Sequence, residues 1–493
     1  MSTAYQSLQS TFDRLYRFQH LKSIAGWDQA ANMPAKGNEA RAAATAEIAA
    51  LIHSIQTDPK LGDWIRAAEG ESLDPVQRAN LREIRRTWLS ATALPEELVR
   101  AQELATARCE HAWRTQRPAN DWKGFLANFE EVLMLAREQA KRLSQALEVS
   151  PYEAMMSLYE PGLRTADLDR WFGDLRSWLP ALIRDVTEKQ SRETVQLPQG
   201  PFDLKAQRDL CEKVMRALGF DFEAGRLDVS THPFCGGVPE DVRITTRFRV
   251  DEFLPSLYGT IHETGHARYE QNLPRTLLGQ PVARARSMAL HESQSLFFEM
   301  QLGCHPGFVA RLAPMLTEAF GVQPAFAPEN LARLLTRVKP GFIRVDADEV
   351  TYPAHILLRY DIERALIEGT MEARDIPERW DQLMQELLGV DTRGNYRDGP
   401  LQDIHWPAGL FGYFPCYTLG AMYAAQWFAA MKAKDPAIDD AIARWDFAQP
   451  FSWLRENIWL QASQWATDEL ATRASGSPLN PEHFRAHLVR RYL

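Results

Sequence analysis

Apolar residues in the N-terminal part of the chain recur at the spacing of one helix face. Between residues 5 and 26 they stand three or four positions apart, at Leu8, Phe12, Leu15 and Phe18. Similar spacing continues to about residue 150. Residues 165–190 begin with Thr165 as a helix cap and repeat the pattern at Leu168, Trp171, Phe172, Leu175 and Leu179. We therefore expect long helices in these regions.

Two segments rich in Pro and Gly, 194–203 and 231–240, interrupt the helical pattern and are expected to be loops. Residues 241–250, DVRITTRFRV, have the β-branched and aromatic alternation of a strand, so a small sheet is expected beside the helix that follows. The predicted fold class is mainly α. Because no repeat or linker is visible, we expect a single unit over 1–493, with a helical lobe at 1–200, a catalytic region at 201–425 and C-terminal helices at 426–493.

Composition narrows the class of protein. A chain of 493 residues with 45% hydrophobic residues can bury a large core, while a net charge of −9 disfavours a nucleic-acid surface. The five cysteines are far apart and form no C-x-x-C pair, which disfavours disulfides and thiolate metal sites. The N-terminal segment lacks the apolar core of a secretory signal, and no apolar stretch is long enough to span a bilayer. These features predict a cytoplasmic protein with no membrane partner.

The segment 251–272 contains the pattern H-E-x-x-H as His262, Glu263 and His266 on a predicted helix. Residues four apart lie about 40° apart around a helix and about 6 Å along it, so both imidazoles can reach one metal ion. The alternative is a surface helix with two solvated histidines. The apolar stripe along this helix favours the metal site.

A catalytic zinc site needs a third protein ligand. Asn272 stands where the metzincin pattern has histidine, so a later carboxylate is required, and residues 288–300, MALHESQSLFFEM, provide one on a second helix. Glu292 is favoured. The alternatives are Glu270, Glu299 and His291.

Two histidines and one glutamate leave a bound Zn²⁺ with net positive charge, which lowers the pKa of bound water and polarises a peptide carbonyl. Glu263 would take the proton from the metal-activated water as general base and pass it to the departing amine. The pattern therefore indicates a zinc-type peptide hydrolase. Other divalent ions, cobalt among them, also suit such a ligand set.

Several motifs resemble, in order, those of the carboxypeptidase Taq family of metallocarboxypeptidases. They are GWDQAANMP (26–34), YEPG (159–162), HPF (232–234), DVRIT (241–245), HETGH (262–266), HESQ (291–294), IRVDAD (343–348) and GPLQDIHW (399–406). The resemblance implies that Glu292 is the third metal ligand. It also implies a two-lobed helical fold with a deep central groove, one zinc or cobalt ion per chain, broad release of C-terminal residues from peptides, and a homodimer.

A carboxypeptidase must bind the free C-terminus of its substrate, and a planar arginine suits a carboxylate because it donates two parallel hydrogen bonds. Arg344 and Arg243 are the candidates. Arg344 has the alternative of an ion pair with Asp346 or Asp348, and these aspartates could instead orient a ligand imidazole. The strand that carries Arg243 could also pair along an exposed edge with an extended peptide.

The Gly-rich, aromatic segment after residue 399 is expected to form a wall of the site. His405 and Tyr417 are predicted to donate hydrogen bonds to the oxyanion of the tetrahedral intermediate, and Tyr413 is a further donor assigned to substrate binding. Each tyrosine could instead be a core residue with a satisfied hydroxyl. His232 is predicted to line the groove, with a simple turn as the alternative.

Two other functions compete with the carboxypeptidase. One is an oligopeptidase with the same metal site that cuts inside short peptides. The other is an inactive binding protein that keeps the fold, which the water-activating Glu263 between the two histidines argues against.

Overall fold

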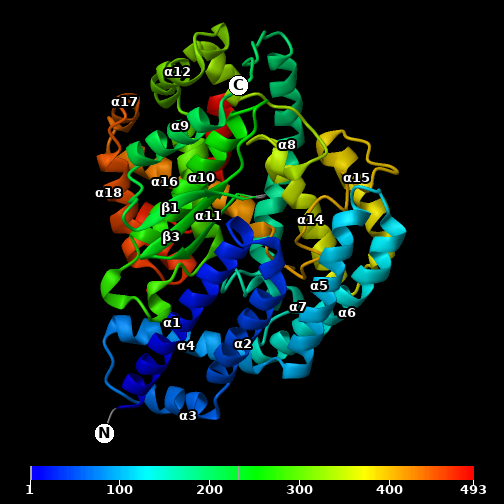
Figure 1. Cartoon of the computed structure of the whole chain (residues 1–493), viewed down its shortest axis with the longest axis vertical. Coiled ribbons are helices and arrows are strands. Elements are labelled where there is room, and N and C mark those ends of the chain that lie inside the picture. The colour runs from blue at the N-terminus through cyan, green and yellow to red at the C-terminus, as the bar shows by residue number, and fades with distance from the viewer. Residues whose placement is uncertain (1–2, 231–232) are drawn as a thin grey trace. The chain divides into compact units, whose positions relative to one another are not determined.

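The computed structural model describes residues 3–230 and 233–493, and Figure 1 shows its elements in chain order. The chain divides into two compact units. Unit 1 comprises Met1–Ala91, Thr194–Leu335 and Gly420–Phe484, and unit 2 comprises Thr92–Glu193, Thr336–Leu419 and Arg485–Leu493. The fold is mainly α with one small sheet, as the sequence predicts. In the described ranges no helix has the length and apolarity needed to cross a bilayer.

The first helices of unit 1 pack around a shared apolar core. They are α1 (Ala4–Ala31), α2 (Asn38–Gln56), α3 (Pro59–Ala68) and α4 (Pro75–Thr92). The predicted apolar face of α1 is buried: Leu8 and Leu15 are fully enclosed and belong to one cluster with Ile84. Burial of this face stabilises α1, which extends five residues beyond the predicted segment.

The remaining helices of unit 1 include the H-E-x-x-H helix, α10. They are α9 (Leu204–Ala217), α10 (Leu254–Gln271), α11 (Met288–Leu296), the π-helical η4 (Phe297–Gly303), α12 (Pro306–Phe320), α13 (Pro328–Leu335), most of α16 (Pro415–Lys434), α17 (Ile438–Ala443), α18 (Ala448–Asn457) and α19 (Thr467–Ser475). Short 3₁₀ turns are η1 (Ala35–Gly37), η2 (Arg275–Leu277), η3 (Pro281–Ala283), η5 (Pro324–Phe326) and η8 (Trp459–Gln461).

The regular elements that the structure describes in unit 2 are all helices. They are α5 (Glu96–Gln116), α6 (Trp122–Leu147), α7 (Pro151–Met156), α8 (Thr165–Gln190), η6 (Arg344–Asp346), α14 (Tyr352–Ile367), η7 (Ala373–Asp375), α15 (Ile376–Leu388) and most of α20 (Glu482–Tyr492). Helix α8 has the predicted bounds. The predicted cap is wrong, because the N-cap is Arg164, and Thr165 instead donates its backbone N–H and its hydroxyl to Glu153.

The sheet of unit 1 has the strand order β1-β3-β2, with β1 (Gly225–Val229) parallel and β2 (Phe234–Val238) antiparallel to β3 (Asp241–Thr246). The predicted strand is therefore β3, which ends four residues earlier than expected. The predicted loop at 231–240 is partly wrong, since β2 lies within it. Gly237 has a φ of +90° and its Cα faces the Asp241 carbonyl so closely that only glycine fits, which allows a Gly-rich stretch to pair in a hairpin.

Helix α10 packs against β3, and Figure 1 shows the sheet beside this helix. The expectation of a small sheet next to the H-E-x-x-H helix is confirmed. The idea that β3 offers an exposed edge to a peptide is wrong, because β3 is the central strand and both of its edges are paired.

Candidate active site

Helix α10 presents His262 and His266 one turn apart, with their ring centroids separated by 5.0 Å. Gly265 lies between them on the side that faces α11. A Cβ added to Gly265 would stand 2.4 Å from the Gln294 carbonyl oxygen and 2.6 Å from the Ser295 Cα. The absence of a side chain therefore lets the two helices touch through their backbones, which brings Glu292 of α11 up to the histidines.

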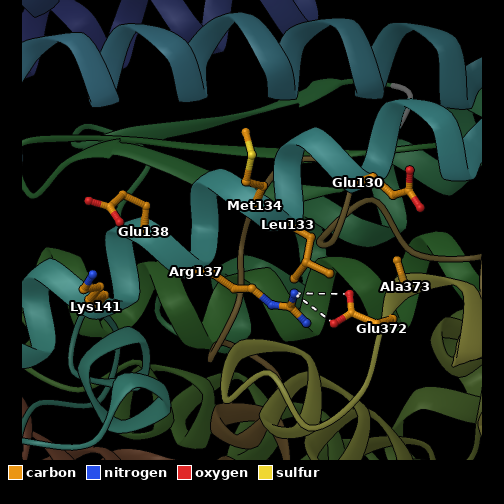
Figure 2. Close-up of a pocket in the computed structure, with 8 residues that line it drawn as sticks. All are labelled: Glu130, Leu133, Met134, Arg137, Glu138, Lys141, Glu372 and Ala373. Carbon is orange, nitrogen blue, oxygen red and sulfur yellow. Dashed lines mark hydrogen bonds and ion pairs between the residues drawn. The ribbon is translucent and has the colours of Figure 1, made fainter.

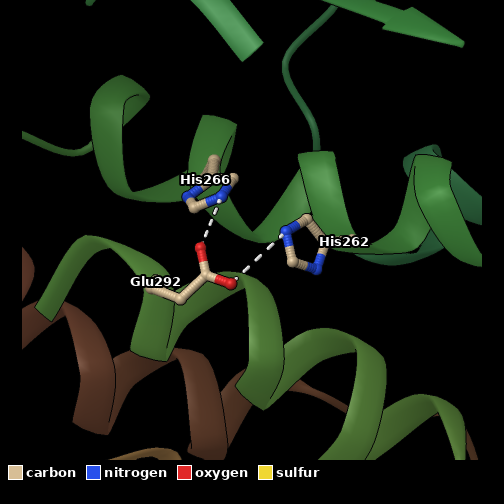
Figure 3. A group of neighbouring side chains, drawn as sticks. All are labelled: His262, His266 and Glu292. Atoms are coloured by element: carbon tan, nitrogen blue, oxygen red, sulfur yellow. Dashed lines mark ion pairs between the residues drawn. The ribbon is translucent and has the colours of Figure 1, made fainter. Parts of the chain in front are cut away.

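Three donor atoms from His262, His266 and Glu292 lie within 4.8 Å of one another (Figure 3). The Nε2 atom of His266 is 3.4 Å from one Glu292 carboxylate oxygen, and the Nε2 atom of His262 is 3.9 Å from the other. Ligand atoms about 2.1 Å from a tetrahedral zinc are about 3.4 Å apart. The donor set and its spacing therefore fit one divalent cation.

The other ring nitrogen of each histidine already has a partner. His262 Nδ1 lies 2.7 Å from Glu299 Oε2. His266 Nδ1 lies 2.6 Å from His291 Nδ1, and His291 Nε2 lies 2.8 Å from Glu270 Oε1. Glu299, His291 and Glu270 were the sequence alternatives for the third ligand, and all three lie on the Nδ1 side of the imidazoles instead.

Charges and burial in this cluster shift the pKa values of its carboxyls in opposite directions. Burial raises the pKa of Glu263 to about 7, although His262 opposes the shift. Burial also acts on Glu292, but the neighbouring His262 and His266 outweigh it and hold the pKa of that carboxyl below its ordinary value. Glu292 is thus suited to hold a cation, and Glu263 can gain and lose a proton near neutral pH.

A second polar cluster, in unit 2, is built on Asp403. One Asp403 oxygen accepts from Arg344 Nη2 at 2.8 Å, and the other accepts from Arg359 Nε at 2.7 Å. Arg359 is fully buried and Arg344 is nearly so. The two guanidiniums hold the pKa of Asp403 well below its usual range despite its burial. Two cations thus share one anion in an enclosed place.

His405 and two tyrosines border this cluster. The Tyr417 hydroxyl lies 3.1 Å from His405 Nε2, and the Arg344 guanidinium lies over the Tyr417 ring, 4.9 Å from its centroid. The Tyr413 ring packs edge-on against Tyr417 at 5.3 Å. Burial lowers the pKa of His405 to about 3, so its imidazole is neutral. The structure thus brings together four of the predicted site residues in unit 2: Arg344, His405, Tyr413 and Tyr417.

Comparison with known proteins decides the family. The model of the carboxypeptidase Taq (M32) metallopeptidases matches residues 7–492. The chain belongs to this family. The matched range covers the H-E-x-x-H helix and every motif on which the sequence resemblance rests, so the predicted family is confirmed.

Relatives and solved structures are similar to this chain over nearly its full length. Thermostable carboxypeptidase 1 of Thermus thermophilus is 38% identical, covering 99% of this chain and 98% of the relative. Metallocarboxypeptidase 1 of Trypanosoma cruzi has a TM-score of 0.97 at 47% identity, covering 99% of both chains. A carboxypeptidase structure from Pyrococcus furiosus has a TM-score of 0.95 at 32% identity, covering 100% of this chain and 99% of the other. The chain is a metallocarboxypeptidase by family, as the sequence predicts.

Arg243 of this family member is held within unit 1. Its Nε and Nη2 donate to the two oxygens of Asp241, the second at 2.7 Å, and its guanidinium stacks on the Trp27 ring at 4.3 Å. This pair has one cation and one anion, so its charge is balanced. His232, the other predicted groove residue from this region, lies outside the described residues.

The two suggestions for Asp346 and Asp348 are wrong. Arg344 pairs with Asp403, not with either of them. Asp348 instead holds the turn before α14, accepting from the backbone N–H and the hydroxyl of Thr351, the N-cap residue. The Nδ1 atoms of the two ligand imidazoles lie beside Glu299 and His291 instead.

Sequence reasoning missed Asp403 and Arg359 as members of the arginine cluster. Asp403 lies inside the quoted GPLQDIHW motif, between residues that the prediction used, but nothing local shows that it faces Arg344, which is 59 residues away. Glu299 was considered only as a ligand. Its position seven residues after Glu292, nearly two helical turns, was the available indication that both carboxylates lie on one helix face.

A surface hollow in unit 2 is lined by residues that belong to neither cluster. Figure 2 shows it along α6, lined by Glu130, Leu133, Met134, Arg137, Glu138, Lys141, Glu372 and Ala373. Arg137 pairs with Glu372 and donates to the backbone carbonyls of Leu366 and Met371, so it fastens α6 to the turn at η7. The ion pair of Arg137 with Glu372 therefore has a structural role. No histidine or cysteine is among the residues that line the hollow.

Proposed function

We propose that this metallocarboxypeptidase releases C-terminal residues from peptides with broad specificity, using one divalent cation held by His262, His266 and Glu292. Zinc is the proposed ion and cobalt the alternative, since two imidazoles and a carboxylate suit both. The observation that carries the proposal is the convergence of three donor atoms within 4.8 Å, with the Nε2 atoms of both histidines facing Glu292.

A bound cation supplies a Lewis acid that polarises the scissile carbonyl and lowers the pKa of water. Glu263 is proposed as the general base. Its carboxylate accepts a proton from water as the water oxygen attacks the carbonyl carbon, and it returns that proton to the amide nitrogen as the C–N bond breaks. The products are a shortened peptide with a new carboxylate and a free amino acid.

Arg344 is proposed to bind the terminal carboxylate of the peptide. In its cluster two arginines share the single carboxylate of Asp403, and His405 beside them is neutral. Arg243 is already neutralised by Asp241. A buried excess cation attracts an anionic substrate group more strongly than a balanced pair does. Arg243 and His232 remain proposed only as residues that line the peptide.

Tyr417 and His405 are proposed to stabilise the oxyanion of the tetrahedral intermediate. Their hydrogen bond fixes the Tyr417 hydroxyl, and a neutral His405 can donate from Nε2 so that the tyrosine proton points elsewhere. Tyr413 packs on the Tyr417 ring and is proposed to contact substrate. The test is the rate with Tyr417→Phe, since loss of one oxyanion donor costs about 10²- to 10³-fold in kcat.

The proposed reaction is tested by mass spectrometry of peptides incubated with the zinc-loaded protein. Half of the peptides carry amidated C-termini, and a chelator-treated sample is the control. Stepwise loss of C-terminal residues from the free-acid peptides alone, abolished by the chelator, is the expected result. Internal cuts in both sets would replace the proposal with an oligopeptidase, and no cleavage would favour a binding protein.

We further propose a cytoplasmic homodimer. The family resemblance supports the dimer, and the absence of a C-x-x-C pair among five scattered cysteines supports the location. Light scattering should give a mass near twice the 56.2 kDa of the chain, and a mass of 56.2 kDa would overturn the dimer. Fractionation of the source cells should recover the protein with cytoplasmic markers.

A further inference from the structure

We propose that Glu299 and the pair His291–Glu270 are positioning residues that set the tautomer and the orientation of the two metal-binding imidazoles. The inference rests on the proposed function, in which His262 and His266 are ligands. It assigns a role to three side chains that the proposed mechanism does not use. Glu299 and His291 each contact a ligand histidine, and Glu270 contacts His291.

A neutral imidazole carries one proton and can offer a cation only its other nitrogen. Both ligand histidines turn Nε2 toward Glu292, so both must carry their proton on Nδ1. A group that only accepts at Nδ1 enforces that tautomer, whereas a donor there would move the proton to the metal-facing nitrogen. The identity of the Nδ1 partners therefore decides whether the site can bind a cation.

For His262 the Nδ1 partner is a carboxylate. Glu299 Oε2 lies 2.7 Å from His262 Nδ1, and a carboxylate can only accept. Glu299 belongs to η4, the π-helical segment that continues directly from α11. Such segments are rare and are frequent at functional sites. One continuous helix thus supplies a direct ligand, Glu292, and the acceptor that orients a second ligand.

For His266 the Nδ1 partner is another imidazole. The two Nδ1 atoms of His266 and His291 are 2.6 Å apart, so one proton lies between them. His291 Nε2 faces Glu270 Oε1 at 2.8 Å, and the carboxylate requires a donor there. The His291 proton therefore sits on Nε2, which leaves its Nδ1 to accept from His266. Glu270 sets the His266 tautomer through this relay, without touching the ligand.

Glu299 and the pair His291–Glu270 are expected to contribute unequally to metal affinity. Glu299 places a carboxylate directly against His262, which makes the imidazole a better donor to a cation, whereas Glu270 reaches His266 only through the ring of His291. Removal of Glu299 should therefore weaken metal binding more than removal of the Glu270 charge. Orienting partners of this kind typically contribute about 10- to 100-fold in metal affinity.

The test measures zinc dissociation constants by competition with a chelator, together with ¹⁵N NMR of the imidazole nitrogens in the zinc-loaded protein. Glu299→Ala and His291→Phe are each expected to weaken zinc binding about 10- to 100-fold. Glu299→Gln should weaken it less than Glu299→Ala, because the amide oxygen still accepts from Nδ1. The spectra should show His262 affected by the Glu299 variants and His266 by His291→Phe.

Leu8→Ala is the control, because it destabilises a buried cluster of unit 1 without touching an imidazole. It should lower the melting temperature and leave the zinc dissociation constant and the spectra unchanged. His262→Ala and His266→Ala test the ligands themselves: full zinc affinity in either would overturn the proposed ligand set. If both lose zinc while Glu299→Ala and His291→Phe bind zinc like the parent protein, with unchanged spectra, only the positioning role is overturned.

Discussion

Gly265 of α10 meets the backbone of Gln294 in α11 so closely that a Cβ would stand 2.4 Å from the Gln294 carbonyl oxygen. We predict that Gly265→Ala destabilises the protein by about 1–3 kcal/mol, because backbone cannot yield as a flexible side chain can. The gain in helix propensity, about 1 kcal/mol, does not offset the clash. The change also separates Glu292 from the histidines, so zinc affinity should fall. Urea unfolding and a zinc titration measure the two effects.

Gly173→Ala is the matched control for this prediction. Gly173 lies within α8, and a Cβ there would meet nothing within 4 Å. The same substitution should therefore stabilise the protein by about 0.5–1 kcal/mol. A similar stability change in both variants would contradict the close helix contact at Gly265.

Glu263→Gln should retain zinc and lose turnover. The amide keeps the size of the side chain but cannot take a proton from water, and general-base catalysis contributes about 10²- to 10⁴-fold. Metal content by atomic emission and kcat with a free-acid peptide are the two measurements. Full activity in the variant would exclude Glu263 as the base, and loss of zinc would indicate a role in the metal site instead.

Arg344→Lys should reduce the preference for free-acid over amidated peptides, chiefly by raising KM. Lysine keeps a positive charge but cannot donate the two parallel hydrogen bonds of a guanidinium. Arg243→Lys is the comparison, because Arg243 has a balanced partner in Asp241. A larger loss of preference in Arg243→Lys would transfer carboxylate binding to that residue.

The C-terminal helix anchors a buried carboxylate whose charge should matter for stability in acid. Glu349 accepts from His487 at 2.8 Å and from Arg491 at 2.9 Å. Burial alone would raise the pKa of Glu349, but Arg491 and His487 outweigh it and lower the pKa to about 2. A lowered folded-state pKa means that the stabilisation is present above the unfolded value, about 4.3, and is lost as pH falls toward 2.

Accordingly, the free energy of unfolding of the parent protein should exceed that of Glu349→Gln by about 3 kcal/mol at pH 6. The difference should shrink steadily below about pH 4.3. Denaturant unfolding of both proteins across this range measures it. Glu318→Gln, which removes an exposed ion pair with Lys213, should change stability little at either pH. A constant difference for Glu349→Gln would contradict the lowered pKa.

The local spacing of residues predicted the helix α8 and the position of the two histidines on α10. The apolar spacing of residues 165–190 gave the bounds of α8, and the H-E-x-x-H spacing placed His262 and His266 on one helix face, as α10 has them. These properties depend on residues within one or two turns of each other, where helix geometry determines which side chains are neighbours. Family membership likewise followed from ordered local motifs.

Tertiary structure decided the partners of those residues. Nothing near Arg344 in the chain indicates Asp403, and nothing near His262 indicates Glu299, because these pairs are 59 and 37 residues apart. The strand β2 is a similar case, since a Gly-rich segment has little strand propensity and pairs only because β3 offers it an edge. The sequence by itself determined the family, the helices and the residues able to hold a metal. Which carboxylate faces which cation was decided by the packing of distant elements, because burial leaves a charged group only the partners that the fold brings to it.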